Sequence, residues 1–312
     1  MNGNREVSIR IDWGLEIIDH DEISGQFRFK LSPNPERYEW RGEGADLFLY
    51  DKLDQIAFPE SVIKSMKQQL EGVEFRFQPQ TAGNIDAYID DRLPDIRAEF
   101  AGTFPDVTGH DRSLEELEGL VGTNHEFAIV SIDLVGSTAL SSTLPPQEYA
   151  RLIRVYVHEL SRLVTYFHGH VLKYTGDGVL AFFAAPSLII KTDHALDYAA
   201  CAIRLVQRGL NPIAAERDFP PIQIRAGLDS GSAAVAVVGH DATKQHPDLI
   251  GKTVNLACKI QSIAPVNGVA IGDFARRHLH TRWRNRCSAL PLPLNWPYRT
   301  ADGSAYPVMR FD

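Results

Sequence analysis

The chain has 312 residues, of which 44% are hydrophobic and 23% are charged. These values are typical of a globular protein with one large domain or two ordinary ones. The formal net charge of −8 argues against nucleic acid or an anionic membrane as the main partner. No apolar run approaches the roughly 18 residues of a membrane span, and no signal-peptide core opens the chain. We therefore expect a cytoplasmic protein that binds neither nucleic acid nor membrane.

The three cysteines, Cys201, Cys258 and Cys287, are far apart in the sequence and have no CxxC spacing. A disulfide framework or a zinc site would need paired or closely spaced cysteines. We expect buried free thiols in a reducing compartment.

Residues 1–122 are predicted to form an α/β N-terminal extension of unassigned role. Alternation of apolar and polar residues predicts strands at 7–17, 26–31 and 73–78. Helical spacing predicts two helices and a short amphipathic connector at 61–72, 84–102 and 111–122. The second helix contains Pro94, and we expect it to break there because proline removes a backbone donor.

Residues 123–312 have an α+β pattern. In chain order we expect a strand at 127–133, a long helix at 145–169, two strands around a tight turn at 170–184 and a helix capped by Asp193 at 193–210. A strand pair at 222–239, a loop entering a helix at 248–264, and a strand with a helix at 268–279 follow. A proline-rich stretch and a closing hairpin follow. The order β-α-β-β-α-β matches the ferredoxin-like, split βαβ arrangement.

Two carboxylates are predicted to lie side by side in this arrangement. Asp133 ends the first strand, and Asp177 lies in the tight turn TGDG. Taken singly, Asp133 is an ordinary cap of the next helix and Asp177 an ordinary turn residue. Together on neighbouring strand ends they would repel each other unless cations lay between them. Mg²⁺ and Mn²⁺ prefer oxygen ligands and often bridge substrate phosphates, so we favour a metal site.

The loop after Asp133 is built from small residues, Gly136, Ser137 and Thr138. Small residues let backbone N–H groups approach a phosphate at the start of a helix, where the dipole favours anions. We therefore predict that this loop binds phosphate groups of a substrate.

A second set of polar residues comes from two other segments. Lys173 lies on the strand that enters the TGDG turn, and Asp248 opens the segment DLIGKTVNLACKI. Asn255 and Lys259 are four residues apart and share one helix face. An exposed lysine and a solvated helix face are the ordinary interpretation. The turn IGKTVN weakens it, since such a turn can present polar groups to a ligand.

Four segments, SIDLVGST, KYTGDGVLAFF, IRAGLDSGSAAV and DLIGKTVNLACKI, in this order and spacing, resemble the catalytic domain of class III nucleotide cyclases. The resemblance covers residues 124–275. It implies a ferredoxin-like domain that works as a head-to-tail homodimer with composite active sites. It also implies a nucleoside triphosphate substrate and two divalent cations, Mg²⁺ or Mn²⁺.

The resemblance assigns a role to each matching position. Asp133, Asp177 and the carbonyl of Leu134 match the metal ligands. Lys173 and Asp248 match the residues that select the base. Asn255 matches the residue that orients the ribose, and Lys259 stands where the family has a transition-state arginine.

The chain departs from the family pattern in two ways. Lysine at 259 cannot offer the bidentate fork of arginine, and the late lysine that grips the terminal phosphates has no clear counterpart. With its unassigned N-terminal extension, the chain resembles the pyrimidine cyclases of bacterial anti-phage (Pycsar) signalling, which make cyclic UMP or cyclic CMP for a separate effector protein. We expect UTP as substrate. The alternatives are an adenylate cyclase and a degenerate module that only binds nucleotide and dimerises.

Overall fold

The structure is a computed structural model that describes residues 11–21, 26–70, 84–105, 112–185, 187–240 and 245–312. The chain separates into two compact units, Met1–Pro79 and Gln80–Asp312. The second unit therefore includes two helices that precede residue 123, α2 (Ile85–Phe100) and α3 (Arg112–Glu118). A functional boundary between residues 122 and 123 stays a prediction. The strand expected at 73–78 lies outside the described residues.

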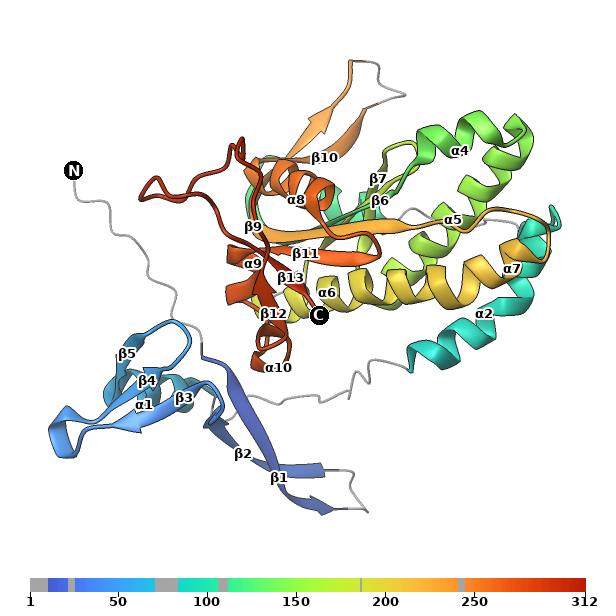
Figure 1. Cartoon of the computed structure of the whole chain (residues 1–312). Helices are drawn as coiled ribbons and strands as arrows, with labels where there is room; N and C mark the ends of the chain where they lie inside the picture. Colours follow the sequence, from blue (N-terminus) through green and yellow to red (C-terminus); the bar gives the residue numbers. More distant parts are fainter. Residues whose placement is uncertain (1–10, 22–25, 71–83, 106–111, 186, 241–244) are drawn as a thin grey trace. The chain divides into compact units, whose positions relative to one another are not determined.

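The first unit contains two small antiparallel sheets and a helix (Figure 1). Its elements are β1 (Trp13–Asp21), β2 (Gln26–Pro33), β3 (Tyr38–Arg41), the 3₁₀ turn η1 (Gly44–Asp46), β4 (Phe48–Asp51), β5 (Ile56–Pro59) and α1 (Glu60–Leu70). Leu49 and Ile63 lie in its small core. Arg37 donates to the Asp51 carboxylate from Nε (2.9 Å) and from Nη2 (2.8 Å), so the buried charges are paired.

The second unit carries the remaining elements. After α2 and α3 they are β6 (Asn124–Leu134), α4 (Ser137–Thr143), α5 (Pro146–Tyr166), β7 (His170–Tyr174), β8 (Val179–Phe183), α6 (Leu188–Leu205), the π-helical turn η2 (Val206–Leu210), α7 (Asn211–Ala215), β9 (Ile224–Val238), β10 (His246–Ile250), α8 (Lys252–Ile263), β11 (Gly268–Gly272), α9 (Asp273–Arg277), α10 (Thr281–Arg284), β12 (Cys287–Ala289) and β13 (Val308–Phe311). The long helix, the β7–β8 hairpin and the closing β12–β13 pair are confirmed.

One sheet organises this unit. Its strand order is β12-β13-β11-β9-β6-β8-β7, with β10 paired to β9. The four strands β9-β6-β8-β7 are mutually antiparallel neighbours, and β11 joins β9 in parallel. The sequence order of those four strands is therefore 4-1-3-2 across the sheet. This is the ferredoxin-like order, and the predicted α+β fold is confirmed.

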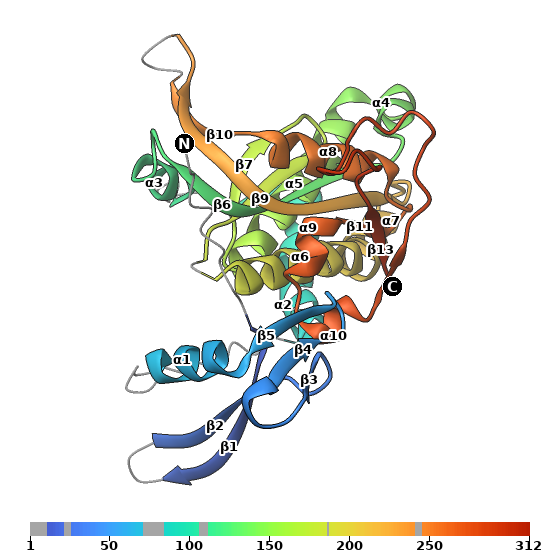
Figure 2. The same ribbon diagram turned by 90° about the vertical axis from the view of Figure 1, so that its left-hand side faces the viewer.

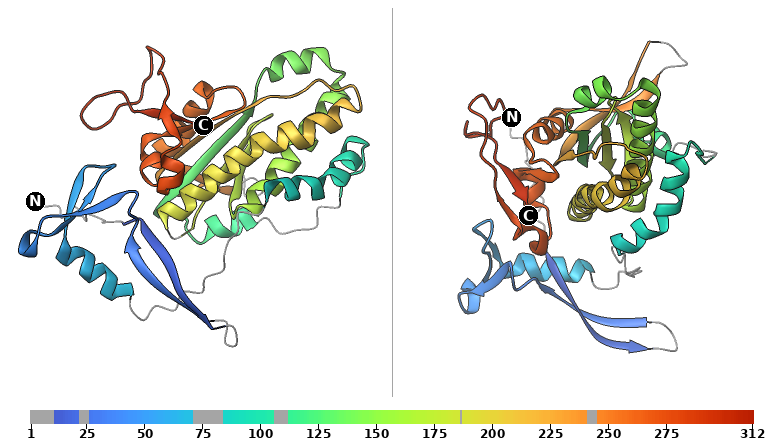
Figure 3. Two further views of the ribbon diagram at one scale, coloured as in Figure 1. Left: turned by 60° about the horizontal axis from the view of Figure 1, so that its bottom comes forward. Right: turned by 45° about the vertical axis from the view of Figure 1, so that its right-hand side comes forward.

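Both faces of the sheet are covered. Helices α5 and α6 pack on one face and α8 on the other, as Figures 2 and 3 show. Alternate residues of β6 point to opposite faces, so Val130 and Ile132 enter the core under α5 and α6. Phe127 and Ile129 enter the core under α8. Side chains on both faces of β6 are therefore fixed by packing.

Helix α8 approaches the sheet closely at one glycine. A Cβ atom on Gly227 of β9 would lie 2.2 Å from the backbone nitrogen of Gln261 and 2.5 Å from the carbonyl oxygen of Ala257. No side chain fits in that space. The backbone of α8 therefore rests directly on the backbone of β9.

Helix α2 runs through Pro94 without a break, which corrects the prediction of a break there. Tertiary packing overrides the local penalty, because Ile89, Ile96 and Phe100 of α2 enter the main core. A buried ion pair adds to this, since Arg92 of α2 donates to both carboxylate oxygens of Glu159 on α5 at 3.2 and 2.6 Å.

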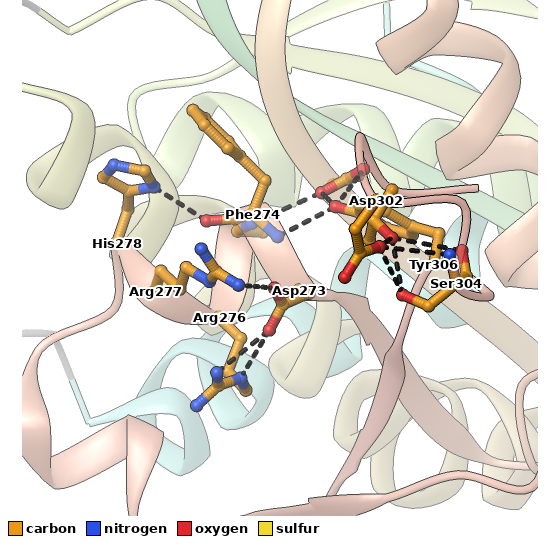
Figure 4. A network of polar contacts seen from close by, with 11 residues as sticks. Asp273, Phe274, Arg276, Arg277, His278, Asp302, Ser304 and Tyr306 are labelled. Carbon is orange, nitrogen blue, oxygen red and sulfur yellow. Dashed lines mark hydrogen bonds and ion pairs between the residues drawn. The ribbon is translucent and has the colours of Figure 1, made fainter. Parts of the chain in front are cut away.

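The C-terminal segment is tied to the sheet by the buried Asp229 of β9. The Tyr306 hydroxyl donates to Asp229 at 3.1 Å and accepts the N–H of Phe274 at 2.8 Å. Figure 4 shows this network beside Asp273, which pairs with two arginines of α9. Burial raises the pKa of Asp229 to about 7, against the hydrogen bonds it accepts. A Cβ on Gly272 would lie 2.5 Å from Asp229 Oδ1, so a glycine is needed there.

Three smaller expectations were wrong. Residues 224–238 form the single long strand β9 rather than a strand pair. Helix α6 begins at Leu188 with Ser187 as its cap, while Asp193 lies inside the helix and accepts the N–H of His280. All three cysteines are free thiols but are only half-buried.

We predict that Arg92→Ala lowers the free energy of unfolding by about 3–5 kcal/mol, because it leaves a buried carboxylate unpaired. The partner, Glu159, is fully buried. Chemical denaturation measures the change. The matched control is Arg97→Ala, whose partner Glu216 is half-exposed, and we expect a much smaller effect there. Equal losses in the two variants would contradict the importance of the buried pair.

Candidate active site

The sheet brings Asp133 and Asp177 together. Asp133 is the next-to-last residue of β6, and Asp177 lies in the turn between β7 and β8. Because Ile132 of β6 pairs with Val179 of β8, the turn that carries Asp177 lies beside the end of β6. The predicted neighbourhood of the two carboxylates is therefore present.

The electrostatics of the pair fit a cation site. Burial and then the nearby charge of Asp177 raise the pKa of Asp133, while the Leu134 N–H and the Arg225 charge lower it. The Oδ2 atom of Asp177 is buried and has no hydrogen-bond partner in the described part of the chain. A buried acceptor without a partner is costly. Two adjoining carboxylates with a spare oxygen form the donor set that Mg²⁺ or Mn²⁺ binds.

Backbone conformation and steric contacts explain why the TGDG turn has glycine at two positions. Gly176 has a φ of +83°, a conformation that side chains disfavour. A Cβ on Gly178 would lie 2.9 Å from Asp133 Oδ1 and 2.5 Å from Thr175 Oγ1. The turn therefore packs against Asp133 only because residue 178 has no side chain.

The small-residue loop leads from β6 into α4. Gly136 has a φ of +72° and precedes the helix, which begins at Ser137. Thr138 is exposed, and its carbonyl accepts hydrogen bonds from Ser141 and Ser142. The N–H groups of a first helical turn have no acceptor within the helix. The loop thus presents backbone donors next to Asp133, while its phosphate-binding role stays a prediction.

Two further residues belong to this end of the sheet and were missed in the sequence. Arg225 of β9 pairs in register with Asp133 of β6, and its Nε atom is buried without a partner in the described residues. Tyr149 of α5 has its pKa raised by burial and by the charges of Asp177 and Asp133. Only the strand register reveals Arg225, and only the packing of α5 reveals Tyr149.

Lys173 and Asp248 contact each other. The Nζ atom of Lys173 on β7 donates to Asp248 Oδ2 on β10 at 2.5 Å. The other oxygen, Oδ1, accepts the N–H of Leu249 at 2.8 Å. Asp248 is mostly buried, and the Lys173 side chain is 39% exposed. A donor and an acceptor are therefore held side by side at a partly open position.

Asn255 and Lys259 are both exposed on α8, one helical turn apart. Among the described residues, no hydrogen bond or ion pair joins either of them to Asp133 or Asp177. The structure thus shows an aspartate pair, a lysine–aspartate pair and two exposed residues of α8, without joining all three in one network.

Comparison with known proteins identifies a protein family that matches this chain. Residues 121–289, more than half of the chain, match the adenylate and guanylate cyclase catalytic domain. Putative adenylate cyclase 3 of Rhizobium meliloti (strain 1021) is 32% identical over 158 residues, which cover 50% of this chain and 23% of that protein. The adenylate cyclase of Anabaena cylindrica is 21% identical over 230 residues, which cover 72% of this chain and 41% of that protein. The matches span less than half the length of these relatives.

Solved structures show the same fold. The guanylyl cyclase Cya2 superposes with a TM-score of 0.51 and 24% identity, over 62% of this chain and 93% of that one. The adenylyl cyclase CyaB from P. aeruginosa gives 0.50 and 21%, over 61% of this chain and 93% of that one.

None of the helices in the described ranges combines the length and the apolar character needed to cross a membrane.

We predict that Asp177→Asn weakens Mn²⁺ binding at least tenfold. Outer partners of metal ligands alone change affinity roughly 10- to 100-fold, and this change removes the charge of a predicted direct ligand. Titration followed by the electron paramagnetic resonance of free Mn²⁺ measures it. Asp218→Asn is the control, because Asp218 is exposed with a φ of +59°, a conformation that asparagine tolerates. Unchanged binding in Asp177→Asn would exclude this metal site.

Proposed function

The chain belongs to the adenylate and guanylate cyclase catalytic domain family, and on that premise we propose that it is a nucleotide cyclase. It would convert a nucleoside triphosphate into a 3′,5′-cyclic nucleotide and pyrophosphate. The observation that carries the proposal is the aspartate pair with the orphaned oxygen of Asp177 at the end of two neighbouring strands.

The reaction is an intramolecular displacement. The ribose 3′-oxygen forms a bond to the α-phosphorus, the bond from the α-phosphorus to the bridging oxygen breaks, and pyrophosphate leaves. The hydroxyl proton passes to solvent. Asp133 and Asp177 would hold two divalent cations, with the Leu134 carbonyl as a further predicted ligand. Such cations lower the pKa of the attacking hydroxyl and neutralise charge on the leaving group.

The neighbouring residues suit a triphosphate. Arg225 lies opposite Asp133 with an unpartnered buried Nε atom, and a guanidinium binds phosphate oxygens well. The N–H groups of Gly136, Ser137 and Thr138 open α4 beside it. These donors would hold the phosphate chain, while Lys259 would stabilise charge that develops on the transferring phosphoryl group.

The base would be selected by Lys173 and Asp248. Their contact presents a donor next to an acceptor in a fixed order. Uracil presents the complement, with O4 as acceptor and N3–H as donor, and guanine offers the same order through O6 and N1–H. Adenine and cytosine reverse it, so each side chain would have to bind the other position of the base edge. An unpaired buried polar edge costs about 1–3 kcal/mol.

We choose UTP among the bases because the chain, with its unassigned N-terminal extension, resembles the pyrimidine cyclases. The resemblance extends the proposal to anti-phage signalling, in which cyclic UMP would act on a separate effector protein. An adenylate cyclase is the alternative suggested by the names of relatives such as that of Anabaena cylindrica. A degenerate binding module is the alternative suggested by lysine at position 259.

The active form would be a homodimer with composite sites. Asn255 and Lys259 are exposed on α8 and have no bond to the aspartate pair of their own chain. The β9–β10 ribbon also exposes apolar side chains, with Val237 and Ile250 each at least half exposed. A second copy would cover them and bring its own α8 toward the aspartate pair of the first.

Incubation of the protein with equimolar ATP, GTP, CTP and UTP and Mn²⁺ tests the reaction and the base together. We expect cyclic UMP as the dominant product by mass analysis, at least tenfold above cyclic AMP and cyclic CMP for one lost hydrogen bond. Cyclic AMP as the dominant product would refute the base assignment and leave the adenylate cyclase interpretation. Cyclic GMP as the dominant product would mean that the donor and acceptor order of the base edge alone selects the substrate. No product from any nucleotide would favour the binding module.

Mixing of two inactive variants tests the composite site. Asp177→Ala removes a predicted metal ligand, and Asn255→Ala removes the predicted ribose contact, so each homodimer should lose turnover. A heterodimer keeps one intact site, so we expect the mixture to regain up to about half of the wild-type activity per heterodimer. Subunit exchange is monitored with differently labelled chains. Exchange without recovered activity would rule out a site shared between chains.

A further inference from the structure

A cavity of about 720 Å³ lies among α2, α5 and β7 in the second unit. None of the residues assigned above to the active site lines it. We call it the α2–α5 cavity, and its main features are three tyrosines, Tyr88, Tyr166 and Tyr174, and two arginines, Arg154 and Arg162. Ligand sites commonly measure about 300–1,000 Å³, so its size suits a small molecule.

Aromatic side chains form part of the cavity walls. The rings of Tyr88 and Tyr166 lie 4.7 Å apart between centroids. The ring of Phe104 packs under the guanidinium of Arg154, with 3.6 Å from the ring centroid to Cζ. Aromatic surfaces of this kind bind planar apolar groups.

The cavity also carries unpaired positive charge. Arg154 and Arg162 are exposed and two turns apart on α5, and neither has a carboxylate partner in the described residues. Two nearby acids have partners other than these arginines, since Glu159 pairs with Arg92 at 2.6 Å and Oε1 of Glu99 contacts His158 at 2.9 Å. The Oε2 atom of Glu99 is buried and has no partner in the described residues.

One polar atom in the lining has no partner. The hydroxyl of Tyr88 is buried and bonds to no described residue. Burial, followed by the charge of Glu159, raises the pKa of Tyr88 to about 12, so the hydroxyl keeps its proton at neutral pH and is free to donate. A buried donor without an acceptor is costly unless a ligand supplies one.

From these features we propose that the α2–α5 cavity binds a small aromatic anion. Its ring system would lie against the tyrosines, and its acidic group would lie near Arg154 and Arg162. Charge complementarity selects an anion over a neutral or cationic ligand, because both free charges are guanidinium groups and guanidinium recognises carboxylate, sulfonate and phosphate groups.

One hydrogen bond links the cavity to the β7–β8 hairpin, which carries Lys173 and Asp177. Tyr174 of β7 bonds through its hydroxyl to Ser161 of α5 at 3.1 Å, and both residues line the cavity. Tyr174 directly follows Lys173 and lies three residues before Asp177. A ligand in contact with Tyr174 would therefore act on the strand that positions both residues. This regulatory consequence rests on the proposed cyclase function, whereas binding itself does not.

The probe for the binding test is 8-anilinonaphthalene-1-sulfonate, an aromatic anion whose fluorescence rises in apolar surroundings. We expect saturable 1:1 binding to the full chain. The double change Arg154→Gln and Arg162→Gln should weaken binding at least tenfold, and Ser161→Phe, which fills the cavity and keeps both charges, should do the same. Arg217→Gln is the matched control, because Arg217 is an exposed arginine that does not line the cavity, and it should bind as the wild type does. Thermal unfolding confirms that each variant is folded.

Absence of saturable binding, or equal binding in all folded variants, would overturn the proposed site. Asp177→Asn should bind the probe normally, so failure of the cyclase proposal would leave this result intact. Turnover is then measured at saturating probe. A changed rate in the wild type that is absent in Ser161→Phe supports regulation, and an unchanged rate refutes regulation while the binding site stands.

Discussion

The placement of β6 between β8 and β9 is the constraint on which the site depends. Both faces of β6 are buried, so its register is strongly specified, because a slip of one residue would turn every side chain to the other face. That register sets Ile132 opposite Val179 and Asp133 opposite Arg225. Two acids and one base from distant parts of the sequence are thereby fixed at one end of the sheet.

The same end of the sheet concentrates charge that the protein alone leaves unbalanced. The charge of Asp177 raises the free energy of the ionised form of Asp133, and Arg225 offsets only part of this. Native proteins rarely leave a buried carboxylate oxygen without a partner. A cation bound at the proposed site would therefore stabilise the fold as well as the proposed reaction, because binding to the native state adds to stability by mass action.

Local signals in the sequence were sufficient for the features that depend on neighbouring residues. Alternation and the TGDG turn placed Asp133 and Asp177 on adjoining strand ends, and the resemblance placed Lys173 with Asp248. Predictions failed where tertiary packing competed with local preference, as at Pro94, where the core on α2 outweighs a lost hydrogen bond. Strand register and the space between α2 and α5 arise only when the chain is folded, so no sequence pattern could have given Arg225 its position or the cavity its walls.

The contact at Gly227 has a consequence for how this site can change. Because the backbone of α8 contacts the backbone of β9 directly, α8 cannot move closer to the sheet. The distance of Asn255 and Lys259 from the sheet therefore does not depend on how core side chains repack. Substitutions in the surrounding core can then accumulate without tilting the helix. The proposed base selection by Lys173 and Asp248 could then change while the groups on α8 keep their positions, so a change of substrate base would require few compensating changes elsewhere in the domain.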